Sequence, residues 1–343
     1  MARRPTLQDL ARAAGVGVAT VDRVLNGRPH VSAATIDRVT EAAQRIGYPT
    51  RGLIARQDAA ARPALRFGFV LQKGAQPFYR DFARALEAAV ADRRDIAGRC
   101  EIRFAASQAP ADAIAELVEL ARRCDALAAA APTHQALTQE VQRLKAAGRP
   151  VFALLNDFAR GARQAYLGLD NVRVGRIAGW MIATQLHRPG KIAVFVGGSR
   201  WHGHILRETG FRSYLRDHAP GMMLLEPMVN LDTRALTYEA TLDLLARHPD
   251  LAGLYVAGGG MEGAIAALRE ARPPGKVALV VNELTEDSRR ALADRVVSLV
   301  IATPLDELCR DLVAMMVQAA RRGPDDSAGQ HFLAPRLFTP ESV

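Results

Sequence analysis

Beyond residue 63 the chain alternates between short apolar runs and longer amphipathic segments, and this rhythm restricts its fold more than any other feature. Ten runs of five to eight residues predict strands at 65–71, 101–106, 126–131, 150–155, 165–169, 191–197, 222–229, 253–257, 276–281 and 296–302. Nearly all of them precede 10–16 residues of helical pattern. Because strands that alternate with helices form parallel sheets covered by helices, and ten strands suit two sheets, we predict an α/β core of two lobes.

The chain before about residue 60 has a different, all-helical pattern. Apolar residues recur at three- and four-residue spacing in 7–15, 18–27 and 32–48. The expected helix starts and ends are Thr6, Gly17 and Ser32, then Gly15, Gly27 and Gly47. Helices from about Leu7 to Ala14 and from about Val18 to Leu25, joined by a tight turn, have the spacing of a helix-turn-helix, whose second helix enters the major groove of DNA.

Basic charge is concentrated in this helical segment. The whole chain has a net charge of +9, and residues 1–57 hold nine arginines against four acidic residues, a net charge of +5. More than half of the excess therefore lies in a sixth of the chain. A concentrated basic surface favours a polyanionic partner, so the N-terminal segment is the expected nucleic-acid surface.

Other classes of protein are poorly supported by the sequence. No apolar run reaches the ~18 residues of a membrane span, and the N-terminus lacks the apolar segment of a signal peptide, so we expect a cytoplasmic protein without a membrane partner. Cys100, Cys124 and Cys309 form no C-x-x-C pair and are interpreted as small buried hydrophobes. Ser199 lacks a G-x-S-x-G setting, and residues 202–204 are too weak a pattern for a metal site. We therefore expect no enzyme activity, metal or cofactor.

The segment from Thr6 to Gly27 carries a specific resemblance. The matching residues are Thr6, Leu7, Asp9, Ala11, Ala14, Gly15, Val16, Ala19, Thr20, Val21, Arg23, Val24, Leu25, Asn26 and Gly27, followed by Val31, Thr35, Arg38, Val39, Gly47 and Tyr48. On these residues the chain resembles the LacI/GalR family of bacterial transcription repressors. Residues 167–179 and 207–215 are similar to the segment leading into the family's second lobe and to its effector motif.

The resemblance implies a domain organisation. Residues 1–49 would form the DNA-binding head, 50–63 a hinge, and 64–343 an effector-binding and dimerisation core similar to type I periplasmic sugar-binding proteins. The first lobe would hold about 64–168 plus 303–328, and the second about 169–302 plus 329–343.

The resemblance also implies roles in the head. Val18 and Ala19 are expected at base edges, where small apolar side chains suit thymine methyl groups. The full set of candidate DNA-binding residues is Thr6, Gly17, Val18, Ala19, Thr20, Asp22, Arg23, Asn26, Arg28, Tyr48 and Leu53. Asp22 departs from the small hydroxyl residue usual in the family, and three alternatives stay open: it points away, pairs with an arginine, or accepts from a cytosine amine.

The expected hinge departs from the family pattern too. The family usually orders a short helix on DNA and inserts a leucine into the minor groove. Here the segment 47–57 is one residue shorter before its proline, lacks the usual asparagine and places Gly52 in the would-be helix, where glycine costs roughly 1 kcal/mol relative to alanine. Leu53 or Ile54 is the candidate wedge.

Ligands of parallel sheets bind beyond the carboxyl ends of the strands, so the loops after strands supply the candidate effector site. Sugars need flat apolar faces beside polar groups. The candidates are Gln72, Gln76, Phe78, Tyr79, Asn156, Asp157, Trp201, Arg207, Gly259, Gly260, Asn282 and Glu283.

The glycine pattern G-x-G-x-x-G at 258–263 leaves two interpretations open. It follows an apolar run and opens a helical segment, as in a dinucleotide-binding unit, so an NAD(P)-binding oxidoreductase is an alternative. Against that, the pattern comes after some 190 residues of other strand–helix units. In the family this turn commonly carries an Asn-Asp pair; with glycines at Gly258 and Gly259, backbone amides at a helix N-terminus could favour a carboxylate or phosphate, hence an oxidised or bulkier sugar.

The resemblance implies a mechanism of allosteric repression. A homodimer would bind double-stranded operator DNA with its recognition helices about 34–36 Å apart. A sugar, polyol or sugar acid bound between the lobes would control operator affinity. An activator or dual regulator of the same family stays open, because it differs in promoter geometry rather than in sequence.

Overall fold

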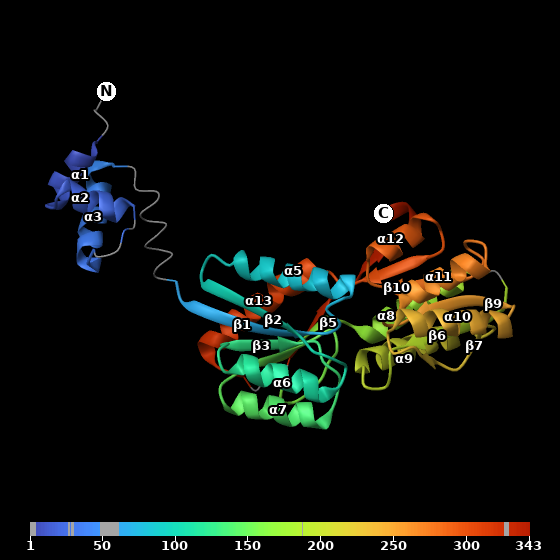
Figure 1. Cartoon of the computed structure of the whole chain (residues 1–343). Helices are drawn as coiled ribbons and strands as arrows, with labels where there is room; N and C mark the ends of the chain where they lie inside the picture. The colour runs from blue at the N-terminus through green and yellow to red at the C-terminus, as the bar shows by residue number, and fades with distance from the viewer. Residues whose placement is uncertain (1–4, 27, 29–30, 49–61, 187, 326–328) are drawn as a thin grey trace. The chain divides into compact units, whose positions relative to one another are not determined.

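The computed structural model describes residues 5–26, 28, 31–48, 62–186, 188–325 and 329–343. The chain divides into two compact units, one of residues 1–64 with 93–97 and one of residues 65–92 with 98–343. The first unit contains the helical head, and the second contains nearly all of an α/β core (Figure 1). Among the described residues no helix is both long and apolar enough to cross a membrane.

The described part of the head folds into three helices, α1 (Leu7–Ala14), α2 (Val18–Leu25) and α3 (Ala33–Ile46). Thr6 caps α1 in a reciprocal arrangement with Asp9, because the Thr6 amide donates to the Asp9 carboxylate at 2.9 Å and the Asp9 amide to the Thr6 hydroxyl at 3.3 Å. Gly15 ends α1 with φ of 64°, a left-handed conformation that glycine adopts without a steric penalty. The predicted bounds of α1 and α2 are confirmed, except that Asn26 is the C-cap of α2, while Gly27 lies outside the described residues.

A small apolar core holds the head together. Its buried members come from all three helices: Leu10, Ala11, Ala14, Val21, Val24, Val39, Ala42 and Ala43. Because each helix contributes one apolar stripe to this core, its opposite face stays exposed. The exposed face of α2 is therefore available to a partner.

The first lobe of the core is a parallel sheet covered on both faces. Its strands are β1 (Ala64–Leu71), β2 (Ala97–Phe104), β3 (Ala126–Ala129), β4 (Val151–Leu154), β5 (Ala165–Leu169) and β12 (Gly329–Leu333), in the order β12-β5-β4-β3-β1-β2. Its helices are α5 (Pro77–Ala91), α6 (Pro110–Ala121), α7 (Gln135–Ala146) and α13 (Leu305–Arg322). Helices α6 and α7 pack on one face, where Val70, Leu127 and Ala153 join their core. Helices α5 and α13 lie on the other face (Figure 1).

The second lobe repeats this architecture. Its strands are β6 (Lys191–Val196), β7 (Met223–Leu224), β8 (Met228–Val229), β9 (Leu251–Val256), β10 (Ala278–Asn282), β11 (Leu299–Ala302) and β13 (Arg336–Phe338). They run in the order β13-β11-β10-β9-β6-β7, with β8 also paired to β6, and β13 is antiparallel to β11. Its helices are α8 (Asn171–Gln185), α9 (His202–His218), α10 (Arg234–Arg247), α11 (Met261–Ala271) and α12 (Glu286–Ala293), and a short 3₁₀ turn, η1 (Pro340–Ser342), follows β13. Alternate strand residues such as Phe195, Val256 and Val281 pack against α10, α11 and α12.

Two predictions about strands are corrected by the structure. The run 222–229 was predicted as one strand, but it forms β7 and β8, which pair with separate ends of β6. Pro227 lies between them and lacks an amide hydrogen, so it interrupts the ladder. Residues 329–343 were assigned wholly to the second lobe, whereas β12 pairs with β5 in the first lobe and only β13 joins the second.

Within the described residues, the chain passes between the lobes three times: from β5 to α8, from β11 to α13 and from β12 to β13. Each lobe is therefore assembled from separate stretches of sequence. The carboxyl ends of the parallel strands in both lobes supply the loops that meet in the pocket described below.

Candidate functional site

The exposed start of α2 is the first candidate site. Val18 is 42% exposed and Ala19 is exposed, while Val21 and Val24 of the same helix are buried in the head core. Arg23 is also exposed. This separation leaves small apolar side chains and a cation on the free face of α2, the combination expected of a helix that reads a DNA groove.

Several polar candidates in the head already have partners. Asp22 accepts from Asn26 Nδ2 at 2.7 Å and lies 3.9 Å from Arg28 Nη1. Of the three alternatives for Asp22, the structure therefore shows pairing with an arginine. The Thr6 hydroxyl donates to the Asp9 carboxylate at 2.7 Å, which ties it to the helix cap.

The remaining head candidates differ in exposure. Gly17 is the exposed N-cap of α2 and Thr20 is half-buried on its first turn. Tyr48 packs partly buried against the head core. Leu53 and Ile54 lie outside the described residues.

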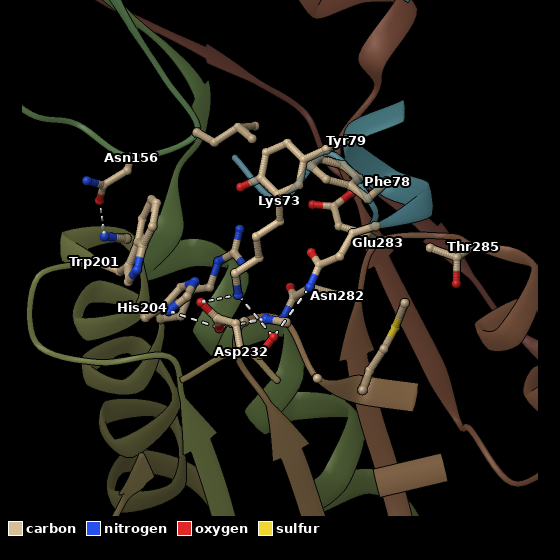
Figure 2. Close-up of a pocket in the computed structure, with 18 of the residues that line it drawn as sticks. Lys73, Phe78, Tyr79, Asn156, Trp201, His204, Asp232, Asn282, Glu283 and Thr285 are labelled. Carbon is tan, nitrogen blue, oxygen red and sulfur yellow. Dashed lines mark hydrogen bonds and ion pairs between the residues drawn. The ribbon is translucent and has the colours of Figure 1, made fainter. Parts of the chain in front are cut away.

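The second candidate site is a cavity of about 110 Å³ within the core, lined by loops of both lobes (Figure 2). The lining residues of the first lobe are Lys73, Gln76, Pro77, Phe78, Tyr79, Gln108, Leu155 and Asn156. Those from α8 onward are Asn171, Trp201, Gly203, His204, Arg207, Asp232, Gly258, Gly259, Gly260, Met261, Glu262, Asn282, Glu283 and Thr285. The pocket thus lies at the carboxyl ends of the parallel strands, where ligands of such sheets bind.

One group of hydrogen bonds joins the lobes through the loop after β1. Lys73 Nζ donates to the main-chain carbonyls of Asp232 at 3.0 Å and Leu231 at 3.3 Å, and Gln76 Nε2 donates to the Asp232 carbonyl at 3.4 Å. Burial lowers the pKa of Lys73, opposed by the nearby Asp232 carboxylate. These side chains hold the loop after β8 against the first lobe.

A second group of contacts joins the lobes at the start of α9. The Gly203 amide donates to Asn156 Oδ1 at 3.0 Å, and Trp201 Nε1 donates to Gln108 Oε1 at 3.0 Å. Figure 2 shows Asn156 and Trp201 side by side on this wall of the pocket. A ligand between the lobes would therefore contact groups that already bridge them.

Arg207 is fixed within the second lobe at the floor of the pocket. Its Nε donates to Asn171 Oδ1 at 2.7 Å and its Nη1 to the Ala257 carbonyl at 2.8 Å, and the residue is 9% exposed. Because two of its three nitrogens bind protein acceptors, the guanidinium is held rigidly. Among the described residues its Nη2 has no protein acceptor.

The end of β10 places two further polar groups at the pocket. Asn282 Nδ2 donates to the Val256 carbonyl at 2.8 Å, but Asn282 Oδ1 is buried without a hydrogen-bond partner among the described residues. The Glu283 carboxylate accepts from the Thr303 amide at 2.9 Å and the Thr303 hydroxyl at 2.8 Å. Burial raises the pKa of Glu283 despite these bonds.

His204 is held in one tautomer when neutral. Its Nδ1 accepts from the Gly197 amide at 3.1 Å, so the ring proton lies on Nε2. Burial lowers the pKa of His204 to about 4. Its ring stacks on Trp201 with centroids 6.0 Å apart. At neutral pH His204 is therefore an uncharged donor.

Phe78 and Tyr79 form the aromatic side of the pocket. They begin α5 and their rings meet edge to face with centroids 5.2 Å apart. Burial raises the pKa of Tyr79, so its hydroxyl keeps its proton at neutral pH. Together with Trp201 they give the pocket apolar faces beside its polar floor (Figure 2).

Comparison with known proteins agrees with this arrangement. Residues 6–50 match the family model described as bacterial regulatory proteins, lacI family, and residues 67–324 match the model described as periplasmic binding protein domain. The chain belongs to the LacI family of bacterial transcriptional regulators. The expected helix-turn-helix head, α/β core and regulatory class are thereby confirmed, and the oxidoreductase alternative is not supported.

Individual relatives of this LacI-family protein span most of its length. The transcriptional regulator CelR of Thermobifida fusca is 29% identical over 80% of this chain and 79% of its own, and the regulator GalS of Salmonella typhimurium is 27% identical over 77% and 75%. A solute-binding protein of an Agrobacterium vitis ABC transporter, solved with α-D-tagatopyranose, shares the fold with a TM-score of 0.73 at 22% identity, over 81% of this chain and 95% of its own. One from Actinobacillus succinogenes, solved with D-allose, has a TM-score of 0.74 at 14% identity, over 82% and 99%.

Most effector candidates of this LacI-family chain lie together. The residues that line the pocket are Gln76, Phe78, Tyr79, Asn156, Trp201, Arg207, Gly259, Gly260, Asn282 and Glu283. Gln72 and Asp157 are not among the lining residues. Gln72 is buried and donates to the Ala130 carbonyl at 3.0 Å, and the Asp157 carboxylate is bound by Arg163, Arg160 and Gln330, which tie it to β12.

In the glycine turn of this LacI-family chain, one backbone amide is already bound by a carboxylate of the protein itself. The Gly259 amide donates to Asp232 Oδ1 at 2.8 Å, so a carboxylate of the protein already lies at this helix N-terminus. A Cβ on Gly263 would lie 2.2 Å from the Arg234 carbonyl, so this glycine lets α11 approach α10 closely. The interpretation as an anion or dinucleotide cradle is therefore wrong for the Gly259 amide.

The sequence reasoning missed several lining residues, notably Lys73, Gln108, Asn171, His204, Asp232 and Glu262. For Asp232 a signal was present: Asn230 and Asp232 directly follow an apolar run. Gln108 gave no comparable signal, because it follows β2 without a distinctive pattern. Asn171 lies in the segment 167–179, which was interpreted as the start of the second lobe and not as part of the effector site.

Proposed function

We propose that this LacI-family regulator is a repressor whose affinity for operator DNA is controlled by a sugar or polyol bound between the lobes. The observation that carries the proposal is the pair of hydrogen-bond groups that join the lobes across the pocket, at Lys73 with Asp232 and at Asn156 with Gly203. A ligand among these groups would alter the balance between closed and open lobes. Coupling of ~1–3 kcal/mol would change operator affinity about 5- to 150-fold.

The chemistry of the pocket supports a polyhydroxy effector. Phe78, Tyr79 and Trp201 offer aromatic faces, and Asn282, Asp232 and Arg207 offer hydrogen-bonding groups among them. Sugar sites combine such apolar faces with a few oriented polar groups. The likeness to solute-binding proteins solved with α-D-tagatopyranose and D-allose supports the same class.

For the head we propose that α2 enters the major groove. Val18 and Ala19 would contact base edges, while Arg23, Thr20 and Gly17 would contact phosphates. Asn26 and Arg28 would join them once DNA competes for their contacts with Asp22. Leu53 stays our candidate for the hinge side chain in the minor groove.

We further propose that the protein acts as a cytoplasmic homodimer without catalytic activity. A dimer would present two recognition helices to a pseudo-palindromic operator. Exposed apolar side chains on the second lobe, Val229, Leu231 and Leu236, are 58%, 51% and 47% exposed and offer a surface for a second copy. Sedimentation analysis that found only monomers at micromolar concentration would contradict the dimer.

A gel-shift experiment tests the proposal as a whole. The full chain is titrated onto DNA from upstream of its own gene, with and without sugars that raise its melting temperature. We expect a shift on this DNA that a stabilising sugar weakens or strengthens at least 5-fold. No preference for this DNA over a shuffled duplex would contradict the regulatory proposal, and an unchanged shift with bound sugar would contradict control by the pocket.

A further inference from the structure

The pocket contains a buried carboxylate from the loop between β8 and α10. Asp232 lies between β8 and α10, its side chain is 9% exposed, and its Oδ1 accepts from the Gly259 amide at 2.8 Å. Asn230 holds both ends of this contact, because its Oδ1 accepts from the Asp232 amide at 2.9 Å and its Nδ2 donates to the Gly259 carbonyl at 2.8 Å. The carboxylate is thus fixed just before the start of α11, and Figure 2 shows Asp232 at the pocket.

Glycines of two other loops leave the space that this carboxylate occupies. A Cβ on Gly197 would lie 2.3 Å from Asp232 Oδ1, a Cβ on Gly258 2.4 Å from the same oxygen, and a Cβ on Gly259 2.9 Å from Asp232 Cβ. Real Cβ atoms do not approach other atoms this closely. A side chain at any of these positions would therefore displace Asp232. These glycines therefore leave room for the Asp232 carboxylate, which occupies the Gly259 amide.

Unfilled hydrogen-bonding capacity remains around Asp232. Asn282 Oδ1 is unpartnered in a residue 3% exposed. Among the described residues Asp232 Oδ2 accepts no hydrogen bond, and its nearest cation is Lys73 Nζ at 3.7 Å. His204 Nε2 supplies a donor, since Nδ1 is occupied by the Gly197 amide. A hydroxyl group both donates and accepts, so adjacent hydroxyls of a ligand would match these acceptors and this donor.

The charges that line the pocket oppose an anionic ligand. Asp232, Glu262 and Glu283 line it on the second lobe, against two cations, Arg207 and Lys73, and Lys73 Nζ already lies 3.7 Å from Asp232 Oδ2. A carboxylate or phosphate of a ligand beside these groups would meet like charges in a partly buried site, where screening by water is weak. The Nη2 of Arg207 can donate to a neutral ligand oxygen as well as to an anion, because only Nε and Nη1 bind protein acceptors among the described residues.

We propose that Asp232 is the specificity-determining residue of the pocket, which with Asn282 and His204 selects a neutral polyhydroxy ligand over its oxidised or phosphorylated counterpart. This inference rests on the proposed sugar or polyol effector, and it identifies the residue that selects that effector by binding its hydroxyl groups. Asp232 acts by accepting hydrogen bonds from ligand hydroxyls and by repelling ligand anions.

Calorimetric titration of the full chain with matched ligands tests the proposal. The probes are neutral sugars and their uronates, D-glucose with D-glucuronate and D-galactose with D-galacturonate, together with D-tagatose, D-allose and xylitol. We expect at least one neutral member to bind and each uronate to bind at least 10-fold more weakly than its parent sugar. The variant Asp232→Asn should bind the neutral ligand about 10- to 100-fold more weakly, the range for a lost hydrogen bond to a charged group, and should discriminate less against the uronates.

A second variant distinguishes loss of the carboxylate from a folding defect. Asp232 has φ of 54°, which glycine tolerates, and removing its side chain frees the space in front of Gly259. The double variant Asp232→Gly, Gly259→Asp would place a carboxylate there from the opposite wall. We expect it to recover at least part of the affinity that Asp232→Gly loses. Asp243→Asn, an exposed carboxylate on α10 paired only with Arg247 among the described residues, is the matched control and should change nothing.

Three outcomes would each contradict a different part of the proposal. Tighter binding of a uronate than of its parent sugar by the wild-type protein would contradict selection of neutral ligands while leaving a sugar-class effector in place. Unchanged neutral affinity in Asp232→Asn, with normal melting temperature, would remove Asp232 from the specificity determinants. Binding of no member of the panel would overturn the sugar or polyol effector itself.

Discussion

The ammonium group of Lys73, in the loop after β1, donates to the main-chain carbonyl of Asp232 in the opposite lobe at 3.0 Å. The same Asp232 presents its carboxylate to the pocket and to the Gly259 amide. A single loop of the second lobe therefore takes part both in joining the lobes and in forming the floor of the pocket. This arrangement connects ligand binding in the pocket to the contacts that hold the two lobes together.

Removing the Lys73 contacts should weaken the attachment of one lobe to the other. In Lys73→Met the side chain keeps its length but loses its donors to Asp232 and Leu231. We expect a larger radius of gyration of the core in small-angle scattering and about 10-fold weaker binding of the sugar found in the ligand screen, because charged hydrogen bonds contribute roughly 1.5–3 kcal/mol. Lys276→Met, on an exposed turn of the second lobe, should leave both quantities unchanged.

Arg23 should contribute to DNA binding independently of sequence. Its side chain is exposed on α2, and a phosphate contact there would release a counterion. We expect Arg23→Ala to weaken binding to specific and shuffled duplexes alike and to reduce the salt slope by about 1. Arg247→Ala on α10 is the control. An unchanged salt slope would remove Arg23 from the phosphate-contacting residues.

His204 should make stability depend on pH in the acidic range. Burial lowers its pKa from 6.5 to about 4, opposed by Asp232 and reinforced by Arg207 and Lys73. Between these two pKa values the unfolded chain binds a proton that the folded protein does not, so the free energy of unfolding falls as the pH drops from about 6.5 to 4. From pH 7.5 to 5.0 the loss should be about 2 kcal/mol.

Urea denaturation of the wild type and of His204→Gln at both pH values measures this contribution. Groups that do not interact with His204 titrate equally in both proteins, so the difference between the two pH dependences reports on His204 and its charged neighbours. A parallel pH dependence in the two proteins would show that His204 titrates normally in the folded state.

Asp157 should matter for stability rather than for ligand binding. Burial alone would raise its pKa, but the hydrogen bonds and charge of Arg163 outweigh burial and lower it. In Asp157→Asn the buried Arg163 would lose its counter-charge, and such losses cost roughly 3–5 kcal/mol. We expect a lower midpoint in thermal unfolding with ligand affinity retained below that midpoint. Loss of ligand binding at unchanged stability would instead show that Asp157 takes part in effector binding.

The sequence predicted the elements whose signals are local. The helices of the head have their caps and apolar spacing within a few residues, so α1 and α2 were placed correctly. Strands such as 165–169 are apolar runs bounded by polar residues and matched β5. β12 was missed because its residues, apart from Leu333, are exposed or half-buried and show no continuous apolar run.

The position of Asp232 could not be predicted from local signals. It depends on space left by Gly197 in one loop and by Gly258 and Gly259 in another, which only the folded sheet brings together. The glycines are visible in the sequence, but the side chain that fills the space between them is not. The pairing of Lys73 with Asp232 joins residues 159 positions apart and is equally invisible in a single sequence.

The most direct test of the account measures operator affinity and ligand occupancy together. Fluorescence anisotropy of an upstream duplex is titrated with the full chain, alone and with a pocket ligand at a concentration that calorimetry shows to saturate the protein. We predict that the ligand changes the dissociation constant for DNA by 5- to 150-fold and that Lys73→Met reduces this change. Equal affinities for DNA with the pocket empty and saturated would contradict it.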